Sequence, residues 1–423
     1  MRWLASHAGA WCVLFCFVAI TGCVAPSERS TAVVTTTSSP TVPASPPPPG
    51  ATPASPPPPS PTTTPSPELA AIQLLTARVG FVSGYNTSGL AKTTDGGATW
   101  QHLPIPRTQV QSIRFIDQTV GWVVGFKSRD VPSYSCQQAA PVAVSRCQGV
   151  VLNTRDGGAT WAESLSIPTD GIMGNPIRQL QAVRGNQAWA LVNVGSGCDG
   201  YGCAELRGTL DSGRTWVKLA GENIIAMRFA TAMAGWIVTE GNTGPVVVSG
   251  TSDGGRTWVK QLSVPSRAFV GFDAAAASSA WLMTRDPSSC TSSNCSSDHI
   301  YRTENSGQSW EELDNPKVNA GDCSFGVLAG PLFASPTRGW LTLSNSAGGV
   351  RVRGGLISTF DGGRTWECST EPSNVRLITA ADPLHLWIGA GGSGTVAALY
   401  STSDSGVHWL PVDLAKLGED ISK

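Results

Sequence analysis

Long polar side chains recur at one position of an apolar segment that this chain repeats along its length. They are Gln73, Arg114, Gln181, Arg228 and Arg376. The corresponding positions of two further repeats carry Val270 and Leu332. Guanidinium groups bind carboxylates with two parallel hydrogen bonds, so three clustered arginines could hold an acidic partner or ligand. The same arginines could instead lie along the surface and cover apolar groups, and the sequence leaves both interpretations open.

Three tyrosines could add to such a site. Tyr85, Tyr134 and Tyr201 occupy segments expected to be loops in three successive repeats. Tyrosine is enriched where proteins contact partners, so these residues are candidates for a contact patch. Solvated loop tyrosines are an equally good interpretation.

Motifs of known catalytic sites are missing. The sequence contains no HExxH, GxSxG or GxxxxGK[ST] segment. A glycoside hydrolase needs a pair of carboxylates, and the expected loops do contain acidic residues: Asp130, Asp199, Glu205, Asp286 and Asp298. Their spacing singles out no pair. We therefore assign no catalytic residue and expect neither a metal nor a cofactor, and we keep a sialidase-like or other glycoside hydrolase as the alternative function.

A repeated eight-residue turn, first seen as TTDGGATW at residues 93–100, defines the elements that must position these residues. Neighbouring copies are between 42 residues (211 to 253) and 61 residues (95 to 156) apart. The aligned positions are Asp95, Asp156, Asp211, Asp253, Asn305, Asp361 and Asp404. An apolar strand and a Gly-Trp pair, or a relative of that pair, precede each copy. Short strands at this period predict an all-β chain: a seven-bladed propeller of four-stranded antiparallel blades over residues 68–415.

The repeated turn is expected to be structural. Its aspartate can accept hydrogen bonds from the backbone N–H groups that follow, and its second glycine permits positive φ. Its tryptophan is expected in the core. Two of the 15 tryptophans, Trp3 and Trp11, lie near the N-terminus, and the other thirteen all belong to the repeats. None is left for an exposed sugar-binding platform.

The pattern S/T-x-D-x-G-x-T-W resembles the Asp box, or BNR repeat, of sialidases and related propellers. The resemblance implies that each turn joins the third and fourth strands of a blade, on the face opposite the usual binding site. The RIP signature and the six blades usual in sialidases do not match this chain.

A longer unit, best seen in IRFIDQTVGWVVG at residues 113–125, resembles the photosystem II assembly/stability factor family. Those proteins are seven-bladed, extracytoplasmic or lumenal propellers without enzymatic activity that bind a membrane protein during assembly. The resemblance covers the whole repeat region and implies a binding protein. Only Arg114, Arg228 and Arg376 could correspond to the arginine-rich patch of that family.

The N-terminal segment indicates export. The apolar run at residues 8–20 followed by ITGC at 20–23 resembles a bacterial lipoprotein signal, which implies a signal peptide at 1–22 and lipidation of Cys23. Half of the 30 prolines lie in residues 24–67, a composition typical of an extended stalk. We expect a lipidated linker at 23–67 and a C-terminal tail at 416–423.

Eight cysteines follow Cys23. Proximity along the chain favours three disulfides and leaves two cysteines to form the fourth: Cys136–Cys147, Cys198–Cys203, Cys290–Cys295 and Cys323–Cys368. Disulfides suit an exported protein, and a zinc site is disfavoured because the CxxC spacing is missing.

The sequence therefore predicts a lipid-anchored, extracytoplasmic and non-catalytic propeller on a bacterial cell membrane. We expect it to bind a protein or envelope ligand as a monomer. A formal net charge of −1 with only 14% charged residues gives no electrostatic reason to expect nucleic-acid binding.

Overall fold

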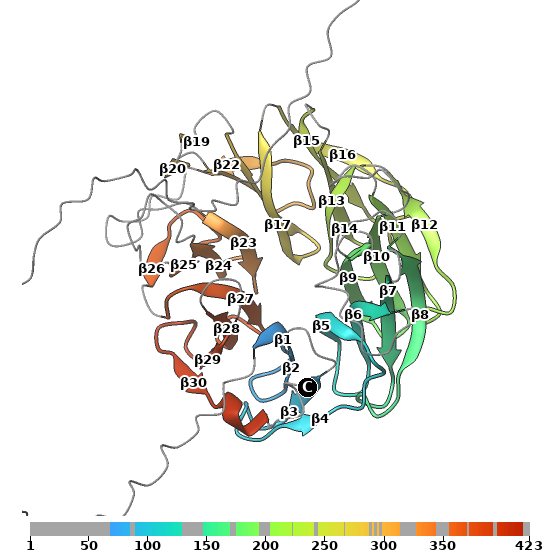
Figure 1. Ribbon diagram of the computed structural model, residues 1–423. Helices are drawn as coiled ribbons and strands as arrows, with labels where there is room; N and C mark the ends of the chain where they lie inside the picture. The colour runs from blue at the N-terminus through green and yellow to red at the C-terminus, as the bar shows by residue number, and fades with distance from the viewer. Residues whose placement is uncertain are drawn as a thin grey trace, which may run out of the picture. The chain divides into compact units, whose positions relative to one another are not determined.

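The chain forms seven four-stranded antiparallel sheets, with one additional two-stranded sheet. The computed structural model describes residues 68–84, 89–128, 147–169, 175–193, 204–221, 223–240, 244–265, 267–286, 290–291, 294–295, 298–313, 327–343, 355–369, 372–391 and 396–417. The seven sheets are arranged as blades around a common axis (Figure 1). The predicted seven-bladed propeller is therefore confirmed.

Each of the first four blades consists of strands that are consecutive along the chain. Blade 1 contains β1 (Leu69–Leu74), β2 (Gly80–Gly84), β3 (Leu90–Thr93) and β4 (Gln101–His102). Blade 2 contains β5 (Gln109–Phe115), β6 (Gly121–Ser128), β7 (Cys147–Thr154) and β8 (Ala162–Pro168). Blade 3 contains β9 (Ile177–Arg184), β10 (Gln187–Asn193), β11 (Ala204–Thr209) and β12 (Val217–Ala220). Blade 4 contains β13 (Ile224–Phe229), β14 (Gly235–Glu240), β15 (Val246–Thr251) and β16 (Val259–Val264).

The last three blades follow the same plan, with one hairpin inserted. Blade 5 contains β17 (Ala268–Ala276), β18 (Ser279–Arg285), β21 (Asp298–Thr303) and β22 (Glu311–Leu313). The hairpin of β19 (Cys290–Thr291) and β20 (Asn294–Cys295) lies between β18 and β21. Blade 6 contains β23 (Val327–Phe333), β24 (Gly339–Leu343), β25 (Leu356–Thr359) and β26 (Glu367–Ser369). Blade 7 contains β27 (Val375–Ala380), β28 (Leu386–Ala390), β29 (Ala398–Thr402) and β30 (Leu410–Val412). The first strand of each blade lies nearest the axis (Figure 1).

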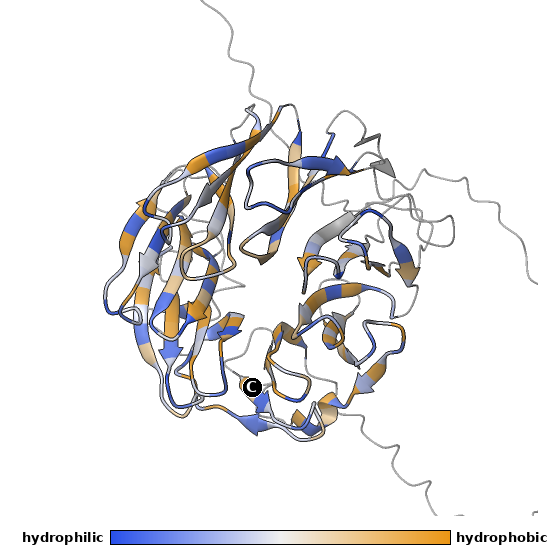
Figure 2. Cartoon of the chain, turned by 180° about the vertical axis from the view of Figure 1, so that it is seen from behind, coloured by the Kyte–Doolittle hydropathy of each residue, from blue (hydrophilic) through white to orange (hydrophobic). Residues whose placement is uncertain are grey.

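Burial changes from strand to strand within a blade. Every residue of β2, β10 and β28 is buried, whereas both residues of β4 and two of the four residues of β12 are exposed. A strand covered on both faces needs apolar residues on both faces, which is why the second strands read as continuous apolar runs. Figure 2 shows hydrophilic and hydrophobic residues alternating along the outer strands.

The apolar core is divided among the blade interfaces. Seven clusters of buried residues each combine side chains from two adjacent blades, including blades 7 and 1. Tryptophans of the second strands, such as Trp122 and Trp281, are fully buried in these clusters. Since each cluster joins different blades, the propeller is stabilised mainly by packing between sheets.

Three of the interfaces contain a stacked aromatic pair with ring centroids 3.6 to 3.7 Å apart. The pairs are Phe81 with Phe115, Trp189 with Phe229 and Trp281 with Phe333. In each pair an aromatic residue from the second strand of an odd-numbered blade meets the phenylalanine that ends the first strand of the next blade. Blades 1 and 2, 3 and 4, and 5 and 6 are therefore paired, and blade 7 follows the last pair.

The ring closes without exchanging a strand between the two ends of the chain. The Leu69 amide donates to the Val396 carbonyl at 2.8 Å. The 3-10 turn η3 (Leu414–Leu417) follows the last strand and places Leu414 and Leu417 in the core between blades 7 and 1. His102 Nε2 donates to the Leu417 carbonyl at 2.8 Å. The folded unit thus extends through Leu417, two residues beyond the predicted end of the repeats.

The predicted turn, called the box below, joins the third and fourth strands of all seven blades. In blade 2, Asp156 Oδ1 accepts hydrogen bonds from Thr154 Oγ1 and from the Thr160 amide, both at 2.8 Å. Asp156 Oδ2 accepts from Thr160 Oγ1 at 2.5 Å. Thr154 Oγ1 accepts from the amide of Gly158, whose φ of +94° favours glycine. The box tryptophans were expected in the core. In the structure only Trp366 is fully buried, and the other six are partly exposed.

The boxes lie at the same end of the blades as the turns between first and second strands. Gly157 donates to the Thr119 carbonyl at 2.8 Å, and Gly254 donates to the Met233 carbonyl at 2.9 Å. We call this end the box face. The loops between second and third strands leave from the opposite end, and most of their residues lie outside the described ranges.

Candidate binding site on the ring axis

The first strands place one residue of every blade opposite the aromatic residue of the second strand. These seven residues form a single register around the axis. They are Gln73, Arg114, Gln181, Arg228, Asp273, Leu332 and Thr379. The register expected from the sequence is therefore correct in five blades and wrong in two.

Val270 and Arg376, which the sequence alignment placed in this register, lie three residues earlier. Asp273 and Thr379 hold the expected positions. Val270 and Arg376 both fall where a β-bulge interrupts pairing with the second strand. A bulge inserts one residue and so reverses the in-out alternation. Two registers three residues apart then show the same apolar pattern, and the sequence alone does not separate them.

The two glutamines of the register connect adjacent blades. Gln73 donates from Nε2 to the Phe115 carbonyl at 2.7 Å and accepts from the Phe115 amide at 2.6 Å. Gln181 makes the same pair of bonds to Phe229, both at 2.7 Å. Since their amide groups are used in this way, we assign the glutamines a structural role and remove them from the partner-binding candidates.

Asp273 was not predicted from the sequence, and it combines two roles. Its Oδ2 accepts from the Phe333 amide at 2.7 Å, as the glutamines do for the other paired blades. Its Oδ1 accepts from Arg228 Nε at 2.5 Å. Asp273 is the only acidic residue in the seven first strands. A single carboxylate in strands that otherwise carry none is the sequence feature from which this residue could have been predicted.

Arg114, Arg228 and Asp273 form what we call the axial cluster. The pKa of Arg114 is lowered to about 10, mainly by burial and then by the charge of Arg228, with Asp273 acting in the opposite direction. This coupling joins blade 2 to blades 4 and 5 across the axis. Arg114 remains protonated at neutral pH, and it donates from one guanidinium nitrogen to the Ile113 carbonyl at 2.9 Å. Two cations and one carboxylate leave the cluster with one excess positive charge.

The axial cluster lies toward the box face. Arg114 and Arg228 are next to last in β5 and β13, directly before the turns that lead to that face. The sequence resemblance implied binding on the opposite face. The structure thus brings Arg114 and Arg228 together at the box-face end of the axis, and it places Arg376 nearer the other end of its strand.

The remaining predicted site residues are only partly described. Tyr85, Tyr134 and Tyr201 lie outside the described residues. Cys147 and Cys368 are disulfide-bonded, and their expected partners, Cys136 and Cys323, also lie outside those residues. The backbones of Cys290 and Cys295 are directly paired in the β19–β20 hairpin, a register that suits a bridge. Cys198 and Cys203 are not described, so the four pairings stay predictions.

Three of the acidic residues expected in loops are described, and the expectation is wrong for two of them, because Glu205 lies in β11 and Asp298 begins β21, while Asp286 lies in a loop. Each of the three is paired with a cation. Glu205 contacts Arg207 at 2.6 Å, Asp286 contacts Arg267 at 2.7 Å and Asp298 contacts Arg285 at 2.6 Å. Burial raises the pKa of Glu205, but hydrogen bonds from Arg207 and Lys218 hold it below its usual value. A general acid needs the opposite shift. Asp130 and Asp199 lie outside the described residues.

Two further observations concern metals and membranes. Within the described ranges, no group of three or more His, Cys, Asp or Glu side chains could hold a metal ion. No helix in the same ranges has the length and apolar character needed to cross a membrane.

The architecture and the axial cluster together define a seven-bladed propeller with a charged axis. No sequence-family model matches the chain, and no curated protein is similar to it in sequence. In three dimensions it is similar to YCF48 bound to D1 peptide, with a TM-score of 0.52 and 19% identity over 80% of this chain and 94% of that one. YCF48 from Cyanidioschyzon merolae gives a TM-score of 0.52 and 16% identity over 80% of this chain and 96% of that one.

A carbohydrate-active enzyme has a similar fold. The GH74 enzyme of Niastella koreensis gives a TM-score of 0.51 and 12% identity, covering 82% of this chain and 54% of the enzyme. The chain therefore corresponds to about half of that enzyme. At these identities the likenesses establish the fold and leave partner and chemistry to be argued from the site.

Proposed function

We propose that this chain is a lipid-anchored, extracytoplasmic and non-catalytic propeller that binds a protein partner, in the manner of an assembly factor. The observation that carries the proposal is the axial cluster, in which Arg114 and Arg228 are balanced by only one carboxylate, Asp273. An excess guanidinium charge favours an acidic group on the partner. The fold likeness to YCF48, which has been solved with a D1 peptide, supports a polypeptide as that partner.

The test removes the two axial cations together. The variant Arg114→Gln with Arg228→Gln should lose most crosslinking between the membrane-bound chain and its partner. The matched control, Arg214→Gln with Arg364→Gln, removes the same charge from two exposed box residues. It should crosslink like the parent chain.

Salt gives an independent measure of the same interaction. Exposed charges are screened over about 10 Å at 0.1 M ionic strength. Capture by the parent chain should therefore weaken as salt rises, and the axial variant should show a smaller salt dependence. Equal capture by parent and axial variant at every salt concentration would contradict the proposal.

A glycoside hydrolase is the second candidate, because the GH74 enzyme shares the fold. The three described acidic candidates, Glu205, Asp286 and Asp298, argue against it, since each is already paired with a cation. Hydrolysis of xyloglucan and of sialosides should be measured on the same variants. Activity in the parent chain that disappears in the axial variant would replace the binding proposal with the enzyme.

A further inference from the structure

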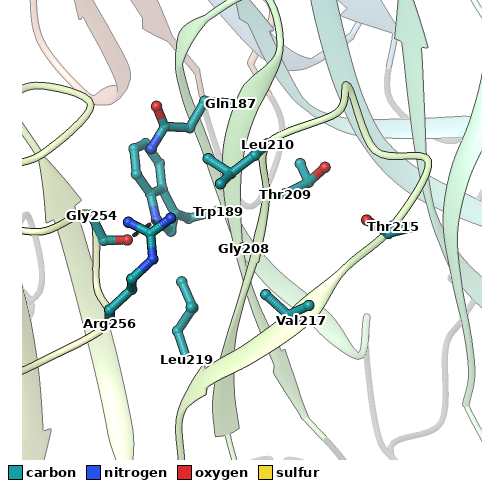
Figure 3. Close-up of a pocket in the computed structure, with 10 residues that line it drawn as sticks. All are labelled: Gln187, Trp189, Gly208, Thr209, Leu210, Thr215, Val217, Leu219, Gly254 and Arg256. Carbon is teal, nitrogen blue, oxygen red and sulfur yellow. Dashed lines mark hydrogen bonds between the residues drawn. The ribbon is translucent and has the colours of Figure 1, made fainter.

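A pocket opens between blades 3 and 4 at the box face. Trp189, Gly254 and Arg256 lie on one side of it, and Leu210, Thr215 and Val217 lie on the other (Figure 3). The space between these residues is about 510 Å³ when its open mouth is included. It lies away from the axial cluster and shares no residue with it.

The pocket lies where three other blades place a bridging side chain and blade 3 has none. In the third strands of three other blades, the residue opposite the second-strand aromatic reaches the next blade's backbone. Lys92 donates to Gln118, Asn153 to Ser212 and Arg302 to Asp361. The equivalent residue of blade 3 is Gly208, opposite Trp189.

Blade 4 also has a glycine at this position, Gly250 opposite Trp236, but there the gap is filled. Gln261 from the fourth strand lies over Gly250, accepts from Trp236 Nε1 at 3.0 Å and donates to the Ser306 carbonyl at 2.9 Å. In blade 3 the fourth-strand residue covering Gly208 is the apolar Leu219. Leu219 adds no polar bridge above Gly208. The hydrogen bonds that connect blade 3 to blade 4 here, from Gln187 Nε2 to the Ala232 carbonyl at 2.8 Å and from Trp189 Nε1 to the Gly254 carbonyl, run along the wall of the pocket and leave the space above Gly208 open and apolar.

The pocket walls favour one kind of chemistry. Trp189 Nε1 already donates to the Gly254 carbonyl at 3.1 Å, so the indole offers mainly its apolar surface. Leu210 and Val217 are 55% and 57% exposed at the mouth. Side chains of this kind are left exposed at a cost and gain free energy when a partner covers them.

Arg256 supplies the charge at the mouth. Its guanidinium donates one hydrogen bond to the Asp253 carbonyl at 3.0 Å, and it has no other partner among the residues that the structure describes. The equivalent box arginine of blade 6, Arg364, instead pairs with Glu311 at 2.9 Å. Arg256 therefore retains donors for a carboxylate from outside the chain.

We propose that this pocket receives an aromatic or large aliphatic side chain of a protein partner, with a neighbouring carboxylate of that partner bound by Arg256. A single buried anchor surrounded by contacts that exclude water is the usual centre of a protein interface. This proposal rests on the proposed function only in taking the partner to be a protein, because the axial cluster is a separate site.

The test uses short peptides and methyl NMR of the full chain. The probes are acetylated, amidated tetrapeptides of sequence Gly-Trp-Glu-Gly, Gly-Trp-Gln-Gly and Gly-Ala-Glu-Gly, together with indole-3-acetate. Gly-Trp-Glu-Gly should shift the methyl signals of Leu210, Val217 and Leu219. Replacing its Glu by Gln should weaken binding roughly two- to fivefold, the range of an exposed ion pair. Replacing its Trp by Ala should abolish the shifts.

Matched variants locate the contacts. Val217→Lys should abolish binding, whereas Val259→Lys changes the same position of blade 4, 66% exposed, and should leave binding unchanged. Arg256→Gln should remove the preference for Glu over Gln, and Arg364→Gln should not.

Three outcomes would overturn the proposal. They are no methyl shifts with any peptide, equal effects of Val217→Lys and Val259→Lys, or binding of indole-3-acetate without binding of the tryptophan peptides. The last outcome would indicate a small-molecule pocket. Because every measurement uses parent axial residues, failure here leaves the role of Arg114 and Arg228 intact, and failure of the axial test leaves this pocket intact.

Discussion

Asp273 of blade 5 accepts a hydrogen bond from Arg228 of blade 4 at 2.5 Å and, through its second oxygen, from the backbone amide of Phe333 in blade 6 at 2.7 Å. One buried carboxylate thus connects three blades at the axis. Its exposed fraction is 2%, so these partners take the place of water around the carboxylate oxygens. The same residue limits how much positive charge the axis can offer an acidic partner.

Asp273→Ala should destabilise the propeller by about 2–4 kcal/mol, because it leaves a buried amide without an acceptor and a guanidinium without its counter-ion. Arg228→Ala should also cost about 2–4 kcal/mol, because it leaves the buried Asp273 carboxylate without its counter-ion although the Phe333 bond remains. Urea denaturation measures both. A loss near zero for Asp273→Ala would show that the carboxylate does not hold the blades together.

Gln73→Leu should lower stability by about 1–3 kcal/mol, because the amide and carbonyl of Phe115 both lose their partner. Crosslinking to the partner per folded molecule should stay at the parent level. This separates the glutamines from Arg114 and Arg228, although all four share one register. Reduced crosslinking at unchanged stability would return Gln73 to the binding site.

The boxes should make stability depend on acid. Hydrogen bonds from the Thr160 hydroxyl and amide, and from the Thr154 hydroxyl, lower the pKa of Asp156 to about 2. The ordinary value in an unfolded chain is about 3.9. A depressed folded-state pKa stabilises the protein fully above the unfolded value, and this contribution is lost as the pH falls through the folded value.

Asp156→Asn tests this sign. The blade 5 box already uses Asn305, which donates to Ser309 Oγ at 2.8 Å and accepts from the Ser309 amide at 2.9 Å, so the turn tolerates asparagine. The variant should melt at a lower temperature than the parent chain at pH 6, and the difference should shrink toward pH 2.5. Calorimetry across that range measures it. A difference that grows with acid would contradict the pKa shift of Asp156.

Cys23→Ala should release the chain from the membrane fraction, because the lipid on this cysteine is the proposed anchor. Mass spectrometry of the parent N-terminus should show the lipid. A variant that stays in the membrane, together with a parent lacking the lipid mass, would refute the lipoprotein proposal.

Peptide mapping without reduction should link Cys147 to Cys136 and Cys368 to Cys323. Cys147 and Cys368 are disulfide-bonded, so the measurement identifies their partners. Cys198 should be linked to Cys203 and Cys290 to Cys295. Links between other pairs would replace this connectivity, and free thiols at Cys198 and Cys203 would remove one bridge.

The sequence alone determined the architecture, for a physical reason that acts locally. The box hydrogen bonds join residues no more than four apart, as from Asp156 to Thr160, so the turn can be recognised wherever it occurs. Seven such turns, each preceded by an apolar strand, require seven blades that bury their faces against one another. The same local pattern correctly placed Arg114 and Arg228 on the axis-facing strands.

Tertiary structure decided which polar residues share a site, because those relationships connect different blades. Gln73 and Arg114 look equivalent in sequence, yet Gln73 is committed to Phe115 of the next blade while Arg114 joins the axial cluster. Val270 and Arg376 lie at bulges three residues before the register, which Asp273 and Thr379 occupy. The pocket at Gly208 likewise depends on a bridging side chain that blades 1, 2 and 5 supply and blade 3 lacks, and on Leu219 standing where blade 4 has Gln261. Such contacts are fixed by packing between sheets, which no spacing within one repeat encodes.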